Sequence, residues 1–289
     1  MFATQAASSW RPDQNACKLT DLLDTRPPRT ENAPLDFPTT RSILDRAEDW
    51  VQQFGKTLRS PSQVPVLNSF RWEHPDKDAG SAQVAKAVRA ISGLRAALHL
   101  ADSGYTVEAG TLLRTVADFT AEIEYLGEAL IEGRLTADQQ KFVEQHFAPF
   151  PEDPDELAAR EREYYIGRKD VAKASRRLFE KWGGKPEEYD KIAAYLHKGY
   201  DSFVHGANES AMQLFTGRTR TFMLRGHESQ RHICMTKVAV AGKLKAFLNA
   251  LRLMAMSRND QTMHDAIRTA FNELDKSEED SGAPCGGLT

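Results

Sequence analysis

Three charged residues, of which the arginine could hold an anion, are spaced by four along one stretch of the chain. Arg114, Asp118 and Glu122 therefore share one face if this stretch is helical. One interpretation is a solvent-exposed ladder of ion pairs, worth ~0.3–0.5 kcal/mol each. In the other, Arg114, which directly follows Leu112 and Leu113, lies partly inside the protein. It would then hold an anionic group or a polar residue of another helix.

A second set of residues combines imidazole and carboxylate groups. His197, Asp201 and His205 are again four apart, with Lys198 and Asn208 close by. A carboxylate that accepts an imidazole N–H fixes the tautomer and raises the basicity of the ring, as in general bases and metal ligands. The alternative is a polar helix face with His205 hydrogen-bonded at its end. Because no third and fourth ligands can be identified, we predict no metal site.

A basic strip lies between Leu157 and Trp182, where eight Lys or Arg residues outnumber four acids. Contacts with a phosphate backbone need such a strip, and a solvated helix face is the alternative interpretation. The candidate nucleic-acid contacts within the strip are Arg168, Lys169, Lys173, Arg176 and Arg177.

The chain lacks the common catalytic and cofactor motifs. His227 and His232 flank a sequence similar to the metalloprotease H-E-x-x-H, but they are five apart, which places them about 140° apart on a helix. The chain contains no glycine-rich phosphate loop, dinucleotide fingerprint, nucleophile elbow or Glu-x-x-His pair. We therefore predict no cofactor. The three cysteines are far apart and form no C-x-x-C, which indicates neither a disulfide framework nor a thiolate zinc site.

Composition and charge argue against several classes of protein, including secreted and membrane-spanning proteins. The chain has 289 residues, of which 40% are hydrophobic, and a net charge of −3. This charge argues against a whole-protein footprint for nucleic acid, although not against a local strip. The N-terminal sequence lacks the basic start and apolar run of a secretory signal, and no apolar stretch approaches the ~20 residues that span a bilayer. These features predict a cytoplasmic protein without a membrane partner.

The elements that position the polar residues are predicted to be helices. Apolar residues recur at helical spacing over 84–101 and, after a Ser-Gly break, over 105–130. The short break predicts that these two helices pack as an antiparallel hairpin at the centre of the fold. Similar patterns predict further helices over 43–58, 157–182, 186–204, 233–255 and 267–274.

The domain organisation follows from the same patterns. We predict an all-α, multi-helix bundle formed by a single domain over residues 39–275. A proline-rich arm, 1–38, and an acidic, glycine-rich tail, 276–289, are expected to be disordered. We expect 60–80 to be a loop that places Phe70 and Trp72 against the core. The segment 216–226 is expected to be a loop or a short hairpin.

Two short motifs suggest a family. The sequence A-G-T-L-L-R-T-V-A-D (109–118), followed by Y-D-S-F-V-H-G (200–206), resembles a group of bacterial all-α proteins that are similar to HEPN domains (higher eukaryotes and prokaryotes nucleotide-binding). In such proteins an early core helix carries L-L-R-x-x-x-acid. A late helix ends in an aromatic residue or Ser, an aliphatic residue and His. The resemblance covers about residues 84–256.

The resemblance implies a function and a set of site residues. Many HEPN proteins are ribonucleases, often toxins or defence factors, with the signature Arg, four to six residues, then His, and two subunits commonly form the site. Here His205 takes the His position, but Lys198 stands where the Arg is expected, with six residues between them. Lys keeps the charge and loses the planar fork that grips phosphate.

The expected function is therefore binding of RNA or nucleotide, or metal-independent RNA cleavage, in a bacterial stress or defence system, with a homodimer as the expected assembly. In the cleaving version His205 is the general acid/base, and Asp201 orients its imidazole. Lys198 or Arg114 stabilises the charge that develops on the phosphate. The alternative is a non-catalytic helical module for protein–protein interaction, in which the polar residues are structural.

Overall fold

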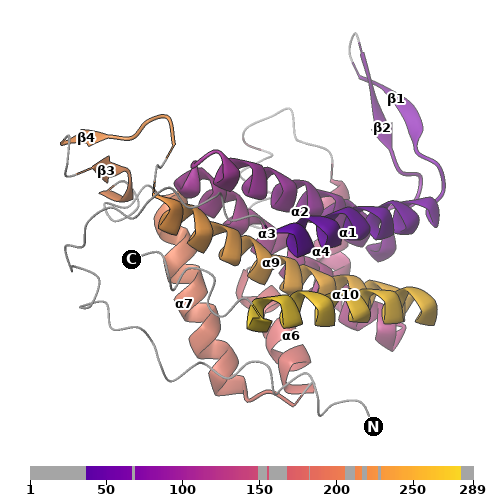
Figure 1. The fold of residues 1–289 in the computed structure, drawn as a ribbon. Helices are drawn as coiled ribbons and strands as arrows, with labels where there is room; N and C mark the ends of the chain where they lie inside the picture. Colours follow the sequence, from indigo (N-terminus) through magenta and orange to yellow (C-terminus); the bar gives the residue numbers. More distant parts are fainter. Residues whose placement is uncertain are drawn as a thin grey trace.

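Helices dominate the part of the chain that the structure describes. The computed structural model describes residues 37–66, 69–148, 155, 168–181, 183–205, 212–216, 220–226 and 229–280. Within these ranges the strands form two short hairpins, and every other regular element is a helix (Figure 1). The prediction of an all-α bundle is therefore confirmed.

The central helix hairpin consists of α2 (Ala79–Asp102) and α3 (Thr106–Glu132). The Asp78 side chain caps α2 by accepting a hydrogen bond from the Ser81 N–H at 2.8 Å. Gly104 turns the chain between the helices with a φ of +81°, a conformation that favours glycine. The predicted pairing of these two helices is confirmed, because they pack along their lengths at the centre of the bundle (Figure 1).

Three further helices complete the main core. These are α1 (Pro38–Lys56), α9 (Gln230–Ser257) and α10 (Gln261–Asp280). Helix α9 packs against α2, α3 and α10, so it lies inside the bundle. Burying one large apolar side chain stabilises the fold by about 1.5–3 kcal/mol. The largest fully buried side chains include Phe54, Leu94, Leu113, Phe247 and Leu251.

The remaining helices cover one side of α3. They are α4 (Ala137–Phe147), α6 (Arg168–Lys181) and α7 (Pro186–Val204), and both α6 and α7 pack on α3. The charged helix predicted to begin at 157 is described only from Arg168 onward. Gly183 follows α6 with a φ of +86°, and Pro186 opens α7, as the predicted stop and start signals require.

Two β-hairpins lie outside the helical core. The first pairs β1 (Ser62–Val66) with β2 (Ser69–Glu73), and the second pairs β3 (Phe215–Thr216) with β4 (Thr221–Phe222). The second matches the short hairpin expected within 216–226.

The first hairpin corrects the prediction of a loop that packs on the core. Phe70 and Trp72 are 53% and 62% exposed, because the hairpin projects from the bundle and no helix covers it (Figure 1). The expectation that these two aromatic side chains lie against the core is wrong.

The two chain ends lie mostly outside the described residues. Of the predicted arm, only Phe37 and Pro38 are described, and α1 begins there. At the other end α10 continues to Asp280, so residues 276–280 belong to a helix instead of to the predicted tail. Cys234 is buried in α9 and is disulfide-bonded, which the cysteine spacing did not predict.

Candidate functional site

The two predicted polar constellations meet between α3 and α7. Arg114 is only 3% exposed, and its Nε donates a hydrogen bond to Asp201 Oδ1 of α7 at 2.9 Å. Its Nη1 pairs with Asp118, one turn further along α3. Burial lowers the pKa of Arg114, but the hydrogen bonds from its guanidinium to Asp201 and Asp118 outweigh this effect and raise it. Arg114 therefore holds a polar residue of another helix, and its charge is neutralised where it lies.

A close helix approach brings Asp201 to Arg114. Gly110 lies one turn before Arg114, and a Cβ atom at Gly110 would come within 2.7 Å of the Phe203 ring. Phe203 and Tyr200 of α7 form a tilted ring pair with centroids 6.4 Å apart. Burial raises the pKa of Tyr200 to about 12, so its hydroxyl stays protonated. The missing side chain of Gly110 thus allows the aromatic face of α7 to seat against α3.

A lysine of α9 completes this cluster, and sequence reasoning missed it. The Lys243 Nζ lies 4.6 Å from the centroid of the Tyr200 ring, a cation–π distance. Burial and the nearby Arg114 cation lower the pKa of Lys243 to about 8, although Asp118 opposes the shift. A lysine inside the apolar sequence K-L-K-A-F-L was the available signal. We call Arg114, Asp118, Asp201, Tyr200 and Lys243 the central polar cluster.

Lys198 and His205 lie on the surface at α7, whereas the Arg114 guanidinium is buried. They are seven residues apart, which places them on nearly the same side of the helix, and both are exposed. His205 follows the last residue of α7, and its backbone N–H donates to the Asp201 carbonyl at 3.0 Å. The His197 side chain and Asn208 lie outside the described set. Among the described residues, Asp201 links Arg114 to α7, the helix that carries Lys198.

Glu122 does not join the central polar cluster. Its carboxylate pairs with Lys86 of α2, with the Lys86 Nζ 2.6 Å from the Glu122 Oε2. The same ammonium lies 5.6 Å from the centroid of Phe119 and 5.4 Å from that of Phe142. Of the three residues spaced by four, Arg114 and Asp118 form the contact with α7, and Glu122 forms a separate contact with α2.

The cations of the predicted basic strip are engaged by acids. Arg177 and Lys181 of α6 reach Glu128 of α3 at 2.7 and 3.1 Å, and Lys181 also pairs with Glu132. Burial raises the pKa of Glu128, but the hydrogen bonds from Arg177 and Lys181 outweigh this effect and lower it. These contacts attach α6 to α3.

The rest of the strip shows the same pattern where it is described. Arg176 pairs with Asp190 of α7 at 3.1 Å, and Lys173 pairs with Asp170 within α6 at 2.6 Å. The side chains of Arg168 and Lys169 lie outside the described set. Each described candidate for phosphate contact is thus in an ion pair with the protein's own carboxylates.

A half-buried glutamate of α3 contacts α6. The Ser175 hydroxyl donates a hydrogen bond to Glu124 Oε2 at 2.5 Å. Burial raises the pKa of Glu124 to about 7, although the hydrogen bond from Ser175 lowers it in part. Burial and the negative charge of Glu124 also raise the pKa of Tyr189 on α7. Nothing in the spacing of the sequence distinguishes Glu124 from the exposed acids of the same helix.

A second ion cluster, of which only the lysine is buried, joins α1, α2 and α9. Lys237 of α9 is 4% exposed, and its Nζ lies 2.7 Å from Asp102 Oδ1 at the end of α2. Arg41 of α1 reaches the other oxygen of Asp102 at 2.5 Å. Burial raises the pKa of Asp102, but hydrogen bonds from the two cations outweigh this and lower it. Through Asp102, these ion pairs connect α1 and α9 to the C-terminal end of α2.

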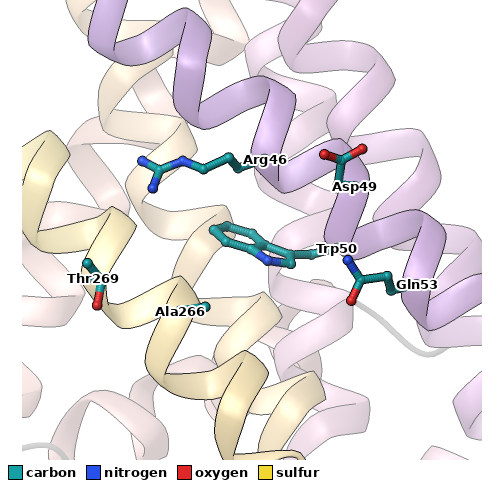
Figure 2. A pocket seen from close by; sticks show the side chains of 6 residues that line it. All are labelled: Arg46, Asp49, Trp50, Gln53, Ala266 and Thr269. Carbon is teal, nitrogen blue, oxygen red and sulfur yellow. The ribbon is translucent and has the colours of Figure 1, made fainter.

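An open pocket lies on a different side of the protein, between α1 and α10. Its volume is about 410 Å³, and Trp50 forms part of its wall (Figure 2). Arg46 from α1 also lines the pocket, and its guanidinium is paired with Glu273 of α10. The pocket shares no residue with the central polar cluster, which lies between α3, α7 and α9.

Two further findings concern metal ions and membranes, and both apply to the residues that the structure describes. These residues contain no group of three or more His, Cys, Asp or Glu side chains placed to hold a metal ion. None of their helices has the length and apolar character needed to cross a membrane. No family model, curated protein or solved structure matches this chain.

Proposed function

We propose that this protein is a helical module for protein–protein interaction and that its central polar cluster is structural. One observation carries the proposal. Arg114 is buried and already held by two carboxylates of the protein itself, whereas large apolar side chains are exposed on hairpins outside the bundle. Exposed apolar groups that gather in this way are typical of interaction surfaces.

Two segments carry these exposed groups. Phe70 and Trp72 lie on β2, with ring centroids 6.0 Å apart in an edge-to-face pair. The second segment begins at the end of α7 and contributes Leu224, which is 79% exposed. Its other exposed apolar residues are Val204, the last residue of α7, Met212 and Phe222. Aromatic side chains supply a large contact area with few rotatable bonds, which favours their use as anchors.

Site-specific photo-crosslinking tests the module. A photoreactive residue would replace Phe70 or Phe222, and an exposed α10 position, Thr262, would serve as the control. The proposal predicts discrete protein crosslinks from position 70, position 222 or both, in extracts of the source cells. Crosslinking at both hairpin positions no stronger than at Thr262 would contradict it.

A second candidate function is RNA binding with metal-independent cleavage, and a specific observation favours it. Lys198 and His205 are exposed on one side of α7 at the spacing of the HEPN signature, with Asp201 one turn before His205. In this candidate His205 takes the proton of a ribose 2′-hydroxyl, whose oxygen attacks the adjacent phosphorus. The bond to the 5′-oxygen breaks, and that oxygen receives a proton, which leaves a 2′,3′-cyclic phosphate.

The roles of the cations differ in this candidate. Lys198 stabilises the charge on the phosphate oxygens, because its ammonium is exposed. Arg114 is a positioning residue, since its guanidinium is occupied by Asp118 and Asp201. The homodimer and the stress or defence setting that the resemblance implies belong to this candidate as well.

Cleavage of a labelled single-stranded RNA distinguishes the two functions. The cleaving candidate predicts activity that persists with chelator, is lost in His205→Ala and is kept or raised in Lys198→Arg. His99→Ala, which changes an exposed histidine of α2, is the matched control. If the wild-type protein cleaves no RNA at any pH and Lys198→Arg creates no activity, the cleaving candidate is wrong and the module stands.

A further inference from the structure

The β1–β2 hairpin is an incomplete sheet. Its two strands pair in an antiparallel register in which Pro65 faces Phe70 and Gln63 faces Trp72. Among the described residues no third strand joins it, and it projects away from the helices (Figure 1). A two-stranded sheet without a packed face is only marginally stable in water, so this hairpin is suited to completion by another chain.

The two edges of the hairpin differ in their capacity to pair. Pro65 has no N–H, and proline occurs in strands where its nitrogen faces solvent. The outer edge of β1 therefore lacks a donor at Pro65. Phe70 is paired with Pro65, so the backbone N–H and C=O of Phe70 also face away from the partner strand. Because these groups alternate sides along a strand, those of Trp72, two residues further on, face the same outer edge of β2. Both residues carry an N–H, so β2 is the open edge.

The charges along β2 are complementary to themselves. Arg71 and Glu73 flank Trp72, and within the strand the Arg71 Nε donates to Glu73 Oε1 at 2.6 Å. If two copies of β2 pair antiparallel about a two-fold axis at Trp72, Arg71 lies opposite the partner subunit's Glu73. The same symmetry places Glu73 opposite the partner subunit's Arg71. Opposite charges that face each other across a ladder stabilise it, and like charges destabilise it.

We infer that β2 pairs with β2 of a second copy of this chain, centred on Trp72, to form a four-stranded sheet. Such a contact uses the same patch on both chains and closes as a dimer instead of growing into a fibre. Phe70 and Trp72 point to one face of that sheet, and their counterparts on the second copy extend the aromatic surface. The inference rests on the proposed function, because it names the partner of the hairpin surface.

Charge reversal provides a test that an internal ion pair cannot mimic. Sedimentation velocity over a concentration series would be measured for the wild-type protein and for the full-length variants Arg71→Glu, Glu73→Arg and the double variant. We expect the wild type to dimerise and each single variant to associate at least about tenfold more weakly, since two facing pairs become like-charged. We expect the double variant to recover the wild-type dissociation constant to within about threefold.

A mixture of the Arg71→Glu and Glu73→Arg variants separates contacts between two chains from the contact within one chain. In a mixed dimer every facing pair is again opposite in charge, although neither chain regains its internal Arg71–Glu73 contact. We expect the mixture to form a heterodimer with affinity near that of the wild type. Arg134→Glu, an equal charge change at an exposed position after α3, is the matched control and should dimerise as the wild type does.

Three outcomes would overturn the inference. They are a wild-type protein that stays monomeric throughout the series, single variants that associate as the wild type does, and single variants that neither mixing nor the double change restores. A monomer whose hairpin still crosslinks to another protein would overturn this inference and leave the proposed function intact. A dimer that obeys the charge rules, together with position-70 crosslinks that join only two copies of this chain, would restrict the module to self-association.

Discussion

Arg114 and Asp201 lie 87 residues apart in the chain, yet the Arg114 Nε donates a 2.9 Å hydrogen bond to the Asp201 carboxylate. This bond ties the central helix α3 to α7, the helix that carries Lys198 and His205 on its surface. The guanidinium is buried and the Asp201 side chain is 42% exposed, so the pair reaches from the core to the surface.

Replacing Arg114 tests its structural role. We expect Arg114→Met to lower the free energy of unfolding by about 2 kcal/mol. Removing one partner of a fully buried ion pair costs ~3–5 kcal/mol, and here solvent around Asp201 reduces the loss. Urea unfolding would measure it. Arg95→Met is the control, because Arg95 pairs with Asp45 and Glu48 on the surface and should cost less than about 1 kcal/mol. Equal losses in the two variants would contradict a special role for Arg114.

Two glycine substitutions should have opposite effects on stability. Gly110→Ala places a Cβ 2.7 Å from the Phe203 ring, so we expect thermal melting to show a loss of about 1–3 kcal/mol as α7 is pushed away. Gly242→Ala in α9 meets no atom within 4 Å, so helix propensity should stabilise the protein by about 0.5–1 kcal/mol. If Gly110→Ala also stabilises, the two helices do not need this close approach.

The buried lysine predicts a stability difference at alkaline pH. The pKa of Lys243 is about 8 in the folded protein, against an ordinary value of 10.5. Below about pH 8 the lysine is charged in the folded protein, and its burial lowers the free energy of unfolding by the full amount. As pH rises from about 8 toward 10.5, the folded protein loses this proton before the unfolded chain does, so the destabilisation decreases. We expect the stability of Lys243→Met relative to wild type to fall by on the order of 1–2 kcal/mol between about pH 7 and pH 10.

Lys276→Met, at an exposed position of α10, is the control for this measurement and should show a flat difference across the same range. Denaturant unfolding at each pH provides the data. A difference for Lys243→Met that is equally flat would show that the ammonium is not destabilised by its surroundings.

Glu124 predicts the opposite dependence in the acidic range. Burial raises its pKa to about 7 from an ordinary 4.5, so the folded protein holds a proton that the unfolded chain releases. The contribution of Glu124 to the free energy of unfolding of the wild-type protein is therefore greatest below pH 4.5 and falls as pH rises through about 7. We expect Glu124→Gln, which keeps the acceptor for Ser175, to gain on the order of 1–2 kcal/mol over wild type between about pH 5 and pH 8.

Glu132→Gln serves as the control for Glu124, because Glu132 lies at the exposed end of the same helix and pairs with Lys181. Thermal melting at a series of pH values would show the effect. A gain for Glu124→Gln that does not grow with pH would mean that the carboxyl is already ionised in the folded protein.

Local pattern was enough to predict most of the helices. The apolar stripes of α2 and α3, with Gly104 between them, predicted the central hairpin, because helical periodicity and a short turn depend on residues near one another in the chain. The spacing of Arg114, Asp118 and Glu122 correctly placed them on one helix. It did not show that Asp118 and Glu122 serve different neighbours, because that depends on where α2 and α7 pack.

The sequence by itself determined the helical class, the order of the main helices and the kinds of charged groups that they carry. Only the tertiary structure decided which of those charges are buried and paired. It placed Lys243 beside Tyr200, joined the cations of α6 to Glu128 and left Phe70 and Trp72 exposed on a hairpin. The physical reason is that helix formation depends on neighbours within a few residues, whereas burial and ion pairing depend on contacts between distant segments.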